Sequence, residues 1–253
     1  MKETGARSVL ETARDLAVAR AQKEGLSDKP ILIRARVLSV REAIGNPEEY
    51  DFPLLKGKEK IIEADYAGHL GHAYTDMYGG FEGSVGDLFR MHAVNNYRRA
   101  LQVAAINALA GYWGLLEDDA VHCKDDRPKK CAAQCREFIG RSYPGAEKIA
   151  FIGYQPALLD AFSGRYRLRI LDLDKDNIGQ HRFGTTVQDG GRDMPEAVAW
   201  ADLVLATGST ITNGTIDDIL NLAGKDKTVF YGVTIAGPAV LLGLKRICFP
   251  QSP

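Results

Sequence analysis

The spacing of apolar residues in the first part of the chain predicts a mixture of helices and strands. Apolar residues recur near every 3.6 positions over 8–24, which predicts an amphipathic helix. They alternate with basic residues over 31–40, which predicts a half-buried strand. Two β-rich segments, 61–67 and 72–77, predict a hairpin, and an apolar stripe within 93–116 predicts a long helix. This order of elements is typical of an α+β unit.

The second part of the chain has a different pattern, in which short apolar runs alternate with segments of helical spacing. Uninterrupted apolar strands are typical of sheets that are covered on both faces, so this alternation predicts a mostly parallel sheet with crossover helices. The expected strands cover 149–152, 168–171, 203–206 and 229–231, and the expected helices cover 157–162, 194–200 and 215–222.

A polar stretch between residues 117 and 130, with four aspartates and a proline, separates the two patterns. Such stretches favour a domain boundary. The sequence therefore predicts an α/β protein with two domains, an α+β domain over 1–118 and a domain built on a mostly parallel sheet over 119–253.

Composition and charge narrow the classes of partner. Of the 253 residues, 45% are hydrophobic and 26% are charged, as in a globular protein with a sizeable core. The net charge of -1 argues against nucleic acid as a partner, because proteins that bind it carry a basic excess. No apolar run approaches the roughly 18 residues of a membrane span, and the charged N-terminus lacks the apolar stretch of a signal peptide. We therefore expect a cytoplasmic protein with no membrane partner.

Residues that follow the expected strands are candidates for ligand binding, because ligands of parallel sheets bind at the carboxyl ends of the strands. Gly153 follows the first of these strands, but the sequence there is not the G-x-G-x-x-G of dinucleotide-binding sheets. Asp172 ends the second strand, where an acid can hold ribose hydroxyls. A solvated carboxylate at a strand end is the alternative interpretation of Asp172.

A hydroxyl-rich segment lies between the third expected strand and a helix expected to begin near Thr215. Its glycines allow close approach of the backbone to a ligand, and the start of the helix supplies free N–H groups. The segment therefore predicts a site for a carboxylate, phosphate or other oxyanion, whereas helix capping by Asn213 or Thr215 would explain only some of its residues. With a Gly-Pro turn expected at the same edge, the candidate ligand-binding residues are Gly153, Asp172, Thr207, Gly208, Ser209, Thr210, Asn213, Gly214, Thr215, Gly237 and Pro238.

Three of the four cysteines lie within thirteen residues near the expected boundary. If the segment is helical, Cys131 and Cys135 share one face of the helix. With Cys123 and His122 folded back, these side chains would complete a tetrahedral Zn²⁺ site, or the three cysteines would hold an iron–sulfur cluster. The spacing matches no common zinc motif, so free structural thiols and a redox disulfide stay open as alternatives.

Several of these motifs resemble the heavy-metal-chelation domain family. The segments ATGSTITNGTIDDIL (206–220), AGPA (236–239) and IAFIGYQP (149–156) are similar to that family, and LGHAYTD (70–76) with AAINAL (104–109) resembles the domain that precedes it. The resemblance implies an enolase-N-terminal-like domain packed on a Rossmann-like domain, with a site at their junction. It also implies a role in metal handling, around corrinoid-type metal-cofactor metabolism, but no settled activity.

Three functional hypotheses follow. The first is a protein that binds a small molecule or a metal complex at the domain junction. The second is a transferase that uses an adenosyl or nucleotide cofactor, in which Asp172 would hold the ribose. The third is a non-catalytic cysteine metallochaperone or sensor. The sequence contains no Ser-His-Asp elbow, P-loop or H-E-x-x-H motif, which disfavours hydrolases and phosphotransferases. A homodimer is a further expectation.

Overall fold

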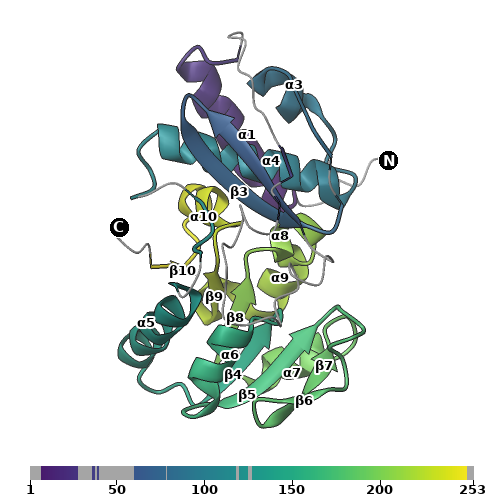
Figure 1. Cartoon of the computed structure of the whole chain (residues 1–253), viewed down its shortest axis with the longest axis vertical. Coiled ribbons are helices and arrows are strands. Elements are labelled where there is room, and N and C mark those ends of the chain that lie inside the picture. The colour runs from purple at the N-terminus through teal and green to yellow at the C-terminus, as the bar shows by residue number, and fades with distance from the viewer. Residues whose placement is uncertain are drawn as a thin grey trace.

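The structure is a computed structural model that describes residues 7–27, 36–37, 39, 60–77, 79–117, 120–124 and 127–249. These residues form a three-stranded sheet and a seven-stranded sheet. The smaller sheet and its helices lie at one end of the molecule, and the larger sheet lies at the other (Figure 1).

The first helix, α1 (Val9–Lys23), begins at a capping box. The Ser8 hydroxyl accepts a hydrogen bond from the Glu11 N–H, and the Glu11 carboxylate accepts one from the Ser8 N–H. Its buried face consists mainly of alanines, which allow close packing against neighbouring helices: Leu10, Ala13, Ala17 and Ala21. The predicted helix is therefore confirmed.

The smaller sheet is antiparallel, in the order β1 (Arg36–Val37), β2 (Lys60–Tyr66) and β3 (His69–Thr75). Ala67-Gly68 forms the two-residue turn between β2 and β3, and both residues have positive φ, which matches the twist of a hairpin. This confirms the predicted hairpin. The strand expected over 31–40 lies outside the described residues, apart from β1 and residue 39.

The central helix, α4 (Asn96–Tyr112), is buried on every side from residue 100 to residue 111. It packs against β2, β3 and α1, and the short helix α3 (Val85–Arg90) precedes it. Small residues allow β3 to approach α4 closely, because a Cβ at Gly71 would lie only 2.3 Å from the Ala104 carbonyl oxygen. Burial on all sides is typical of a helix at the centre of a fold rather than at its surface.

The larger sheet has the strand order β10-β9-β8-β4-β5-β7-β6, and only β6 and β7 pair antiparallel. The predicted α/β fold with a mostly parallel sheet is therefore confirmed. The strands are β4 (Lys148–Ile152), β5 (Arg167–Asp172), β6 (His181–Arg182), β7 (Thr185–Asp189), β8 (Leu203–Thr207), β9 (Thr228–Tyr231) and β10 (Arg246–Ile247).

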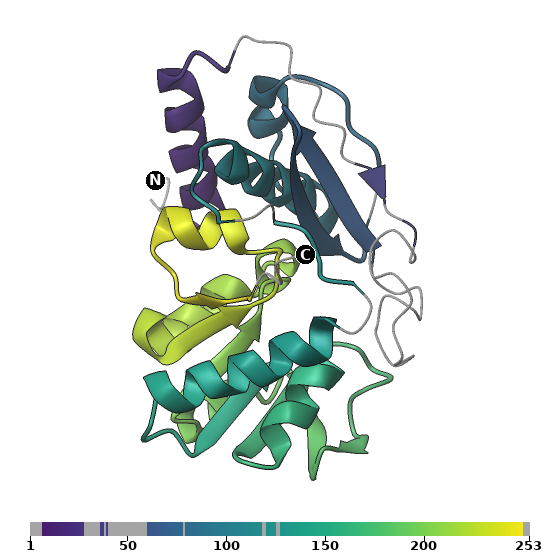
Figure 2. The ribbon, with the colours of Figure 1, turned by 60° about the vertical axis from the view of Figure 1, so that its left-hand side comes forward.

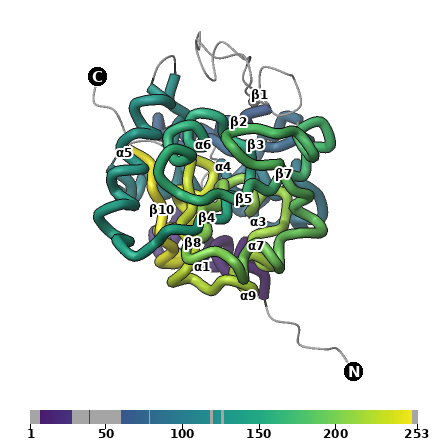
Figure 3. The backbone as a smooth tube through the Cα atoms, turned by 90° about the horizontal axis from the view of Figure 1, so that it is seen from below, coloured from purple at the N-terminus to yellow at the C-terminus, as the bar shows by residue number. Residues whose placement is uncertain are grey.

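Helices cover both faces of this sheet (Figure 3). Alternate residues of β4 belong to two different cores: Ile149 and Phe151 pack with α5 and α6, whereas Ala150 and Ile152 pack with α7 and α9. Burial on both faces explains why the strand is apolar throughout. The helices are α5 (Arg127–Ser142), α6 (Pro156–Ser163), α7 (Met194–Trp200) and α9 (Ile216–Lys227).

Two further helices, α8 (Thr210–Asn213) and α10 (Ala236–Leu242), connect the larger sheet to the N-terminal elements. Figure 2 shows α10 between α1 and the larger sheet, and both α8 and α10 contact α4. No helix in the described part of the chain is long and apolar enough to cross a membrane. The predicted boundary between residues 118 and 119 falls outside the described residues, so the division into domains stays a prediction.

The junction between the two sheets is held by Asn107 of α4, which is 0% exposed. Its side-chain amide donates to the carbonyl oxygens of His72 (2.8 Å), Val233 (3.2 Å) and Thr234 (3.0 Å). Its side-chain oxygen accepts from the Gly237 N–H at 2.7 Å. One side chain thus joins β3, α4 and the segment that leads from β9 into α10.

We predict that Asn107→Ala lowers the free energy of unfolding by about 2–4 kcal/mol, because it leaves several buried backbone groups without a partner. Urea denaturation would measure the change. Asn221, an exposed asparagine of α9, provides a matched control whose replacement by alanine should change the stability by less than about 0.5 kcal/mol. Equal effects of the two substitutions would contradict the role assigned to Asn107.

Candidate functional site

The carboxyl ends of β4 and β8 form the point at which the larger sheet reverses its direction of winding. From β4 the chain proceeds through α6 to β5 on one side, whereas β8 lies on the other side of β4 and leads to α9 on the opposite face. Open parallel sheets bind their ligands beyond the strand ends at such a topological switch point. We use "switch point" for three residues there: Gly153, Thr207 and Ser209.

Gly153 and Thr207 contact each other at the switch point. Gly153 has a φ of 102°, and a Cβ atom built on it would lie 2.6 Å from Thr207 Cγ2. Its carbonyl oxygen accepts a hydrogen bond from the Tyr231 hydroxyl at 3.0 Å. Only glycine suits this backbone conformation and this close contact.

Most side chains of the hydroxyl-rich segment form hydrogen bonds within the protein. Thr210 Oγ1 donates to the Thr207 carbonyl oxygen at 2.8 Å, and Thr215 Oγ1 donates to Asn213 Oδ1 at 2.8 Å. Gly214 ends α8 in the left-handed conformation. The helix expected near Thr215 is confirmed as α9, but α8 was not expected within the segment.

Two hydroxyls of this segment have only long internal hydrogen bonds. The oxygens of Thr207 and Ser209 lie 3.5 Å apart, and the Ser209 N–H lies 3.4 Å from Thr207 Oγ1. Both distances are at the weak end of the range for hydrogen bonds. These two side chains therefore remain the best placed to bond an external group.

The remaining glycines allow contact between backbones. A Cβ at Gly208 would lie 2.8 Å from the Ile235 nitrogen, and a Cβ at Gly237 would lie 2.7 Å from the Ile106 carbonyl oxygen. The expected Gly237-Pro238 turn is instead the first turn of α10. Proline fits there because the first turn of a helix does not require its N–H.

Asp172 stabilises its own loop. Its Oδ1 accepts from the N–H groups of Leu173 (2.6 Å) and Asp174 (3.1 Å), and its Oδ2 accepts from the Asn177 amide at 2.7 Å. Both carboxylate oxygens of Asp172 therefore already accept hydrogen bonds from the protein, in place of the ribose hydroxyls that the sequence suggested.

His122 and the buried His72 form a partly buried polar group with Glu63 beside the junction. The His122 N–H donates to His72 Nδ1 at 3.1 Å, so His72 carries its proton on Nε2, which lies 2.9 Å from Glu63 Oε2. The His122 ring packs edge-on against Tyr74, and its buried Nδ1 has no hydrogen-bond partner among the residues that the structure describes. Burial and the neighbouring His72 lower the pKa of His122 to about 4.

The thiols form a cluster that includes Cys248, which is not among the ligands predicted from the sequence. Cys131 and Cys135, one turn apart on α5, have their sulfur atoms 3.9 Å apart. The Cys131 thiol also hydrogen-bonds with Cys248, and Cys123 interacts with both Cys131 and Cys248. We call these four residues the thiol cluster.

The predicted metal ligands are thus divided between two groups. His122 contacts His72 and Tyr74, whereas Cys123, the next residue, faces the other thiols. Consecutive residues of an extended segment point to opposite sides, which accounts for this separation. Among the described residues, no three His, Cys, Asp or Glu side chains are already arranged around a metal ion.

Three thiols of the cluster have raised pKa values. Burial, followed by the nearby Cys131 and Cys248, raises the pKa of Cys123 to about 12. The hydrogen bond with Cys135 is the main cause that raises the pKa of Cys131 to about 11. The pKa of Cys248 is also raised, mainly by its hydrogen bond with Cys131 and then by burial.

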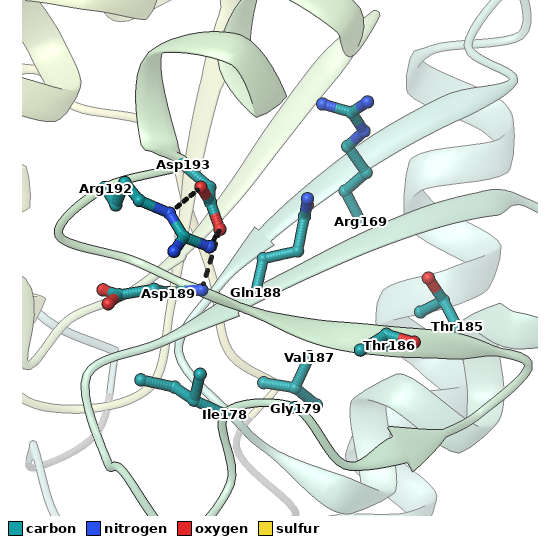
Figure 4. Close-up of a pocket in the computed structure, with 10 residues that line it drawn as sticks. All are labelled: Arg169, Ile178, Gly179, Thr185, Thr186, Val187, Gln188, Asp189, Arg192 and Asp193. Atoms are coloured by element: carbon teal, nitrogen blue, oxygen red, sulfur yellow. Dashed lines mark hydrogen bonds and ion pairs between the residues drawn. The ribbon is translucent and has the colours of Figure 1, made fainter.

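A cavity of about 420 Å³ lies along β5 and β7 beside α7, and it contains none of the predicted site residues (Figure 4). Its two arginines already have acidic partners: Arg169 bonds Glu196 at 2.8 Å, and Arg192 bonds Asp193 at 2.7 Å. The cavity is lined by Arg169, Ile178, Gly179, Thr185, Thr186, Val187, Gln188, Asp189, Arg192 and Asp193.

Residues 139–242 match the model of the DUF364 family, which is described as "Putative heavy-metal chelation". Over this region the chain is similar to that family. The DUF364 region runs from the end of α5 to the end of α10 and contains the switch point. All four residues of the thiol cluster lie outside it.

Crystal structures of two DUF364 proteins of unknown function resemble this chain. The protein from Pyrococcus horikoshii is 20% identical, with 89% of this chain and 79% of that chain covered and a TM-score of 0.57. The protein from Desulfitobacterium hafniense is 12% identical, with 88% and 76% covered and a TM-score of 0.51. Both show the fold of the DUF364 region and its N-terminal neighbour. No curated protein matches the chain.

We predict that Gly153→Ala lowers the stability by about 2 kcal/mol or more, since it adds both a strained φ and a clash with Thr207. Gly179→Ala provides a control, because Gly179 also has a positive φ but, in the described part of the chain, no non-neighbouring atom lies within 4 Å of its expected Cβ. The control should cost only about 1 kcal/mol. Urea denaturation of both variants would measure the difference, and equal costs would argue against a close contact at the switch point.

We also predict that His122 makes the protein less stable as the pH falls from about 6.5 to 4. In this range the unfolded chain binds a proton at His122 and the folded protein does not, so protons favour unfolding. His122→Phe should lower by about one the number of protons taken up on unfolding. Urea denaturation at several pH values would measure this number. A pH dependence identical to that of the original protein would contradict the prediction.

Proposed function

We propose that this protein binds a small polar ligand, including a metal complex with a polar periphery, at the switch point of the larger sheet. The observation that carries the proposal is the contact between Gly153 and Thr207 where β4 and β8 diverge, with the hydroxyls of Thr207 and Ser209 only weakly bonded. The function implied by the DUF364 description supports a metal-containing ligand.

The interlocked junction supports a preorganised site. Thr212 Oγ1 donates to the Tyr74 carbonyl oxygen at 2.8 Å, and the Tyr74 N–H donates to Thr234 Oγ1 at 3.2 Å. Arg99 Nε donates to the Thr212 carbonyl oxygen at 2.7 Å. The elements beside the switch point are therefore fixed before a ligand arrives, which reduces the entropy lost on binding.

The donor atoms at the switch point restrict the class of ligand. Neutral hydroxyls can donate to an oxyanion and accept from a hydroxyl or an amide. They are hard ligands, which suit Mg²⁺ or Ca²⁺ better than a soft heavy-metal ion. A heavy metal would therefore bind at this place within an organic complex, through the polar groups of that complex.

The transferase hypothesis loses its main support. An adenosyl cofactor needs an acid for its ribose, and the Asp172 carboxylate is already held by three donors of its own loop. The expectation of a homodimer stays a prediction.

Isothermal titration calorimetry with three probes tests the proposal: cobinamide as a corrinoid complex, inorganic phosphate as an oxyanion, and S-adenosylmethionine. We expect cobinamide or phosphate to bind, and the double change Thr207→Val with Ser209→Ala to weaken that binding at least about tenfold, since two hydrogen bonds are lost. Thr186→Val, on the exposed part of β7, is the matched control and should leave binding unchanged.

Two outcomes would overturn the proposal. The first is that the double variant binds cobinamide or phosphate as tightly as the original protein does. The second is that none of the three probes gives a heat of binding. Tight binding of S-adenosylmethionine alone would favour the transferase hypothesis instead.

A further inference from the structure

The thiol cluster joins three separate parts of the chain. Cys123 lies in the segment that leaves the junction, Cys131 and Cys135 lie on α5, and Cys248 directly follows β10. The helix α5 and the strand β10 lie side by side in Figures 1 and 3. All four cysteines of the chain therefore meet at one edge of the larger sheet, and none forms a disulfide.

The spacing of the Cys131 and Cys135 sulfur atoms suits coordination to one metal ion. In a tetrahedral zinc–thiolate site with bonds of about 2.3 Å, neighbouring sulfur atoms are about 3.8 Å apart. The observed separation of Cys131 and Cys135 is 3.9 Å. A disulfide would require about 2.05 Å, and two residues one turn apart on a helix cannot reach that distance without distortion.

The surroundings of the thiol cluster supply positive charge and hydrogen-bond donors, which stabilise a metal–thiolate complex. Four thiolates around a divalent ion carry a net charge of −2. Arg127 lies near Cys123, and Arg246 hydrogen-bonds Cys248, so two guanidinium groups face that charge. The Phe249 N–H donates to the Cys131 sulfur. Donors of this kind hold metal ligands in place and stabilise their charged form.

Packing limits access of water most at Cys135, whereas the other three thiols are partly exposed. Cys135 is buried with Ala132 and Ile139 of the same helix, and Phe138 packs near Phe249 with ring centroids 6.0 Å apart. An apolar shell around thiolates strengthens their attraction to a cation, because the local dielectric constant is low.

We propose that Cys123, Cys131, Cys135 and Cys248 form a tetrahedral site for one soft divalent ion such as Zn²⁺ or Cd²⁺. Thiolates prefer such ions to Mg²⁺ or Ca²⁺. On binding, four S–H groups lose their protons to water and four metal–sulfur bonds form, with no change in oxidation state. The site does not rest on the ligand proposed at the switch point, since it shares no residue with it.

Binding requires the thiol side chains to reorient. Cys131 hydrogen-bonds with Cys135 and Cys248, whereas Cys123 interacts with the other thiols only electrostatically, and in the described residues the four thiols are not directed at one point. Rotation of single side chains would replace the S–H···S contacts by bonds to the metal. Because protons compete with the metal for the thiols, affinity should fall as the pH is lowered.

Titration of the reduced full-length protein with Co²⁺, under exclusion of oxygen, tests the site. We expect one equivalent to bind with intense d–d bands of a tetrahedral thiolate complex, and Zn²⁺ to displace it. Cys248→Ser should weaken Co²⁺ binding about 100-fold or more and change the band pattern, because a ligand is lost.

His122→Ala is the decisive control. It removes the imidazole of the ligand set predicted from the sequence, yet leaves the four thiols in place. We expect it to leave Co²⁺ affinity and spectrum unchanged. Loss of binding in His122→Ala together with unchanged binding in Cys248→Ser would overturn the proposal.

A measurement on the original chain covers the case in which a cysteine variant does not fold. X-ray absorption of the zinc-loaded protein should show four sulfur neighbours at about 2.3 Å. A shell with nitrogen or oxygen in place of one or more sulfurs, or the absence of stoichiometric zinc, would overturn the four-thiol site. Neither result depends on binding at the switch point, so the two proposals succeed or fail separately.

Discussion

The side chain of Asn107 is the constraint on which the arrangement of the two sheets depends. A buried amide has two donor hydrogens and one acceptor oxygen, and here each is matched by backbone groups of β3 or of the segment between β9 and α10. An aspartate would lose the donors, and a leucine would lose both donors and acceptor. The two parts are therefore held at one relative position by groups that can pair in only one way, whereas apolar contacts alone would allow sliding.

Close packing makes this hydrogen bonding possible. Gly71 lets β3 lie against the backbone of α4, and Gly237 lets the start of α10 approach the same helix from the other side. The alanines of α4 complete a helix that is thin enough to be enclosed by elements of both parts. The motifs LGHAYTD, AAINAL and AGPA thus meet in space, and their small residues serve contact between backbones.

The sequence predicted the fold better than it predicted the site. Apolar runs such as 149–152 gave strands because burial on both faces leaves a clear signal, whereas β7 (TTVQD) is polar and was missed. The hydroxyls of 207–215 showed a capacity for hydrogen bonds but not their partners, since Thr212 bonds a strand more than a hundred residues away. Cys248 was left out of the cysteine group for a similar reason: only the pairing of β10 with β9 and the position of α5 bring it to Cys131.

The enclosure of α4 also bears on how the chain is made. The polypeptide leaves the ribosome N-terminus first, and the partners of this helix in α8 and α10 are synthesised about a hundred residues or more later. The first turn of α1 also has a partner that is synthesised much later, because the Val9 N–H donates a hydrogen bond to Asp217 Oδ1 at 2.8 Å. Until then an apolar surface meant for the interior is exposed on the nascent chain. The native packing around α4 is therefore completed only after the strands of the larger sheet up to β9 have been synthesised.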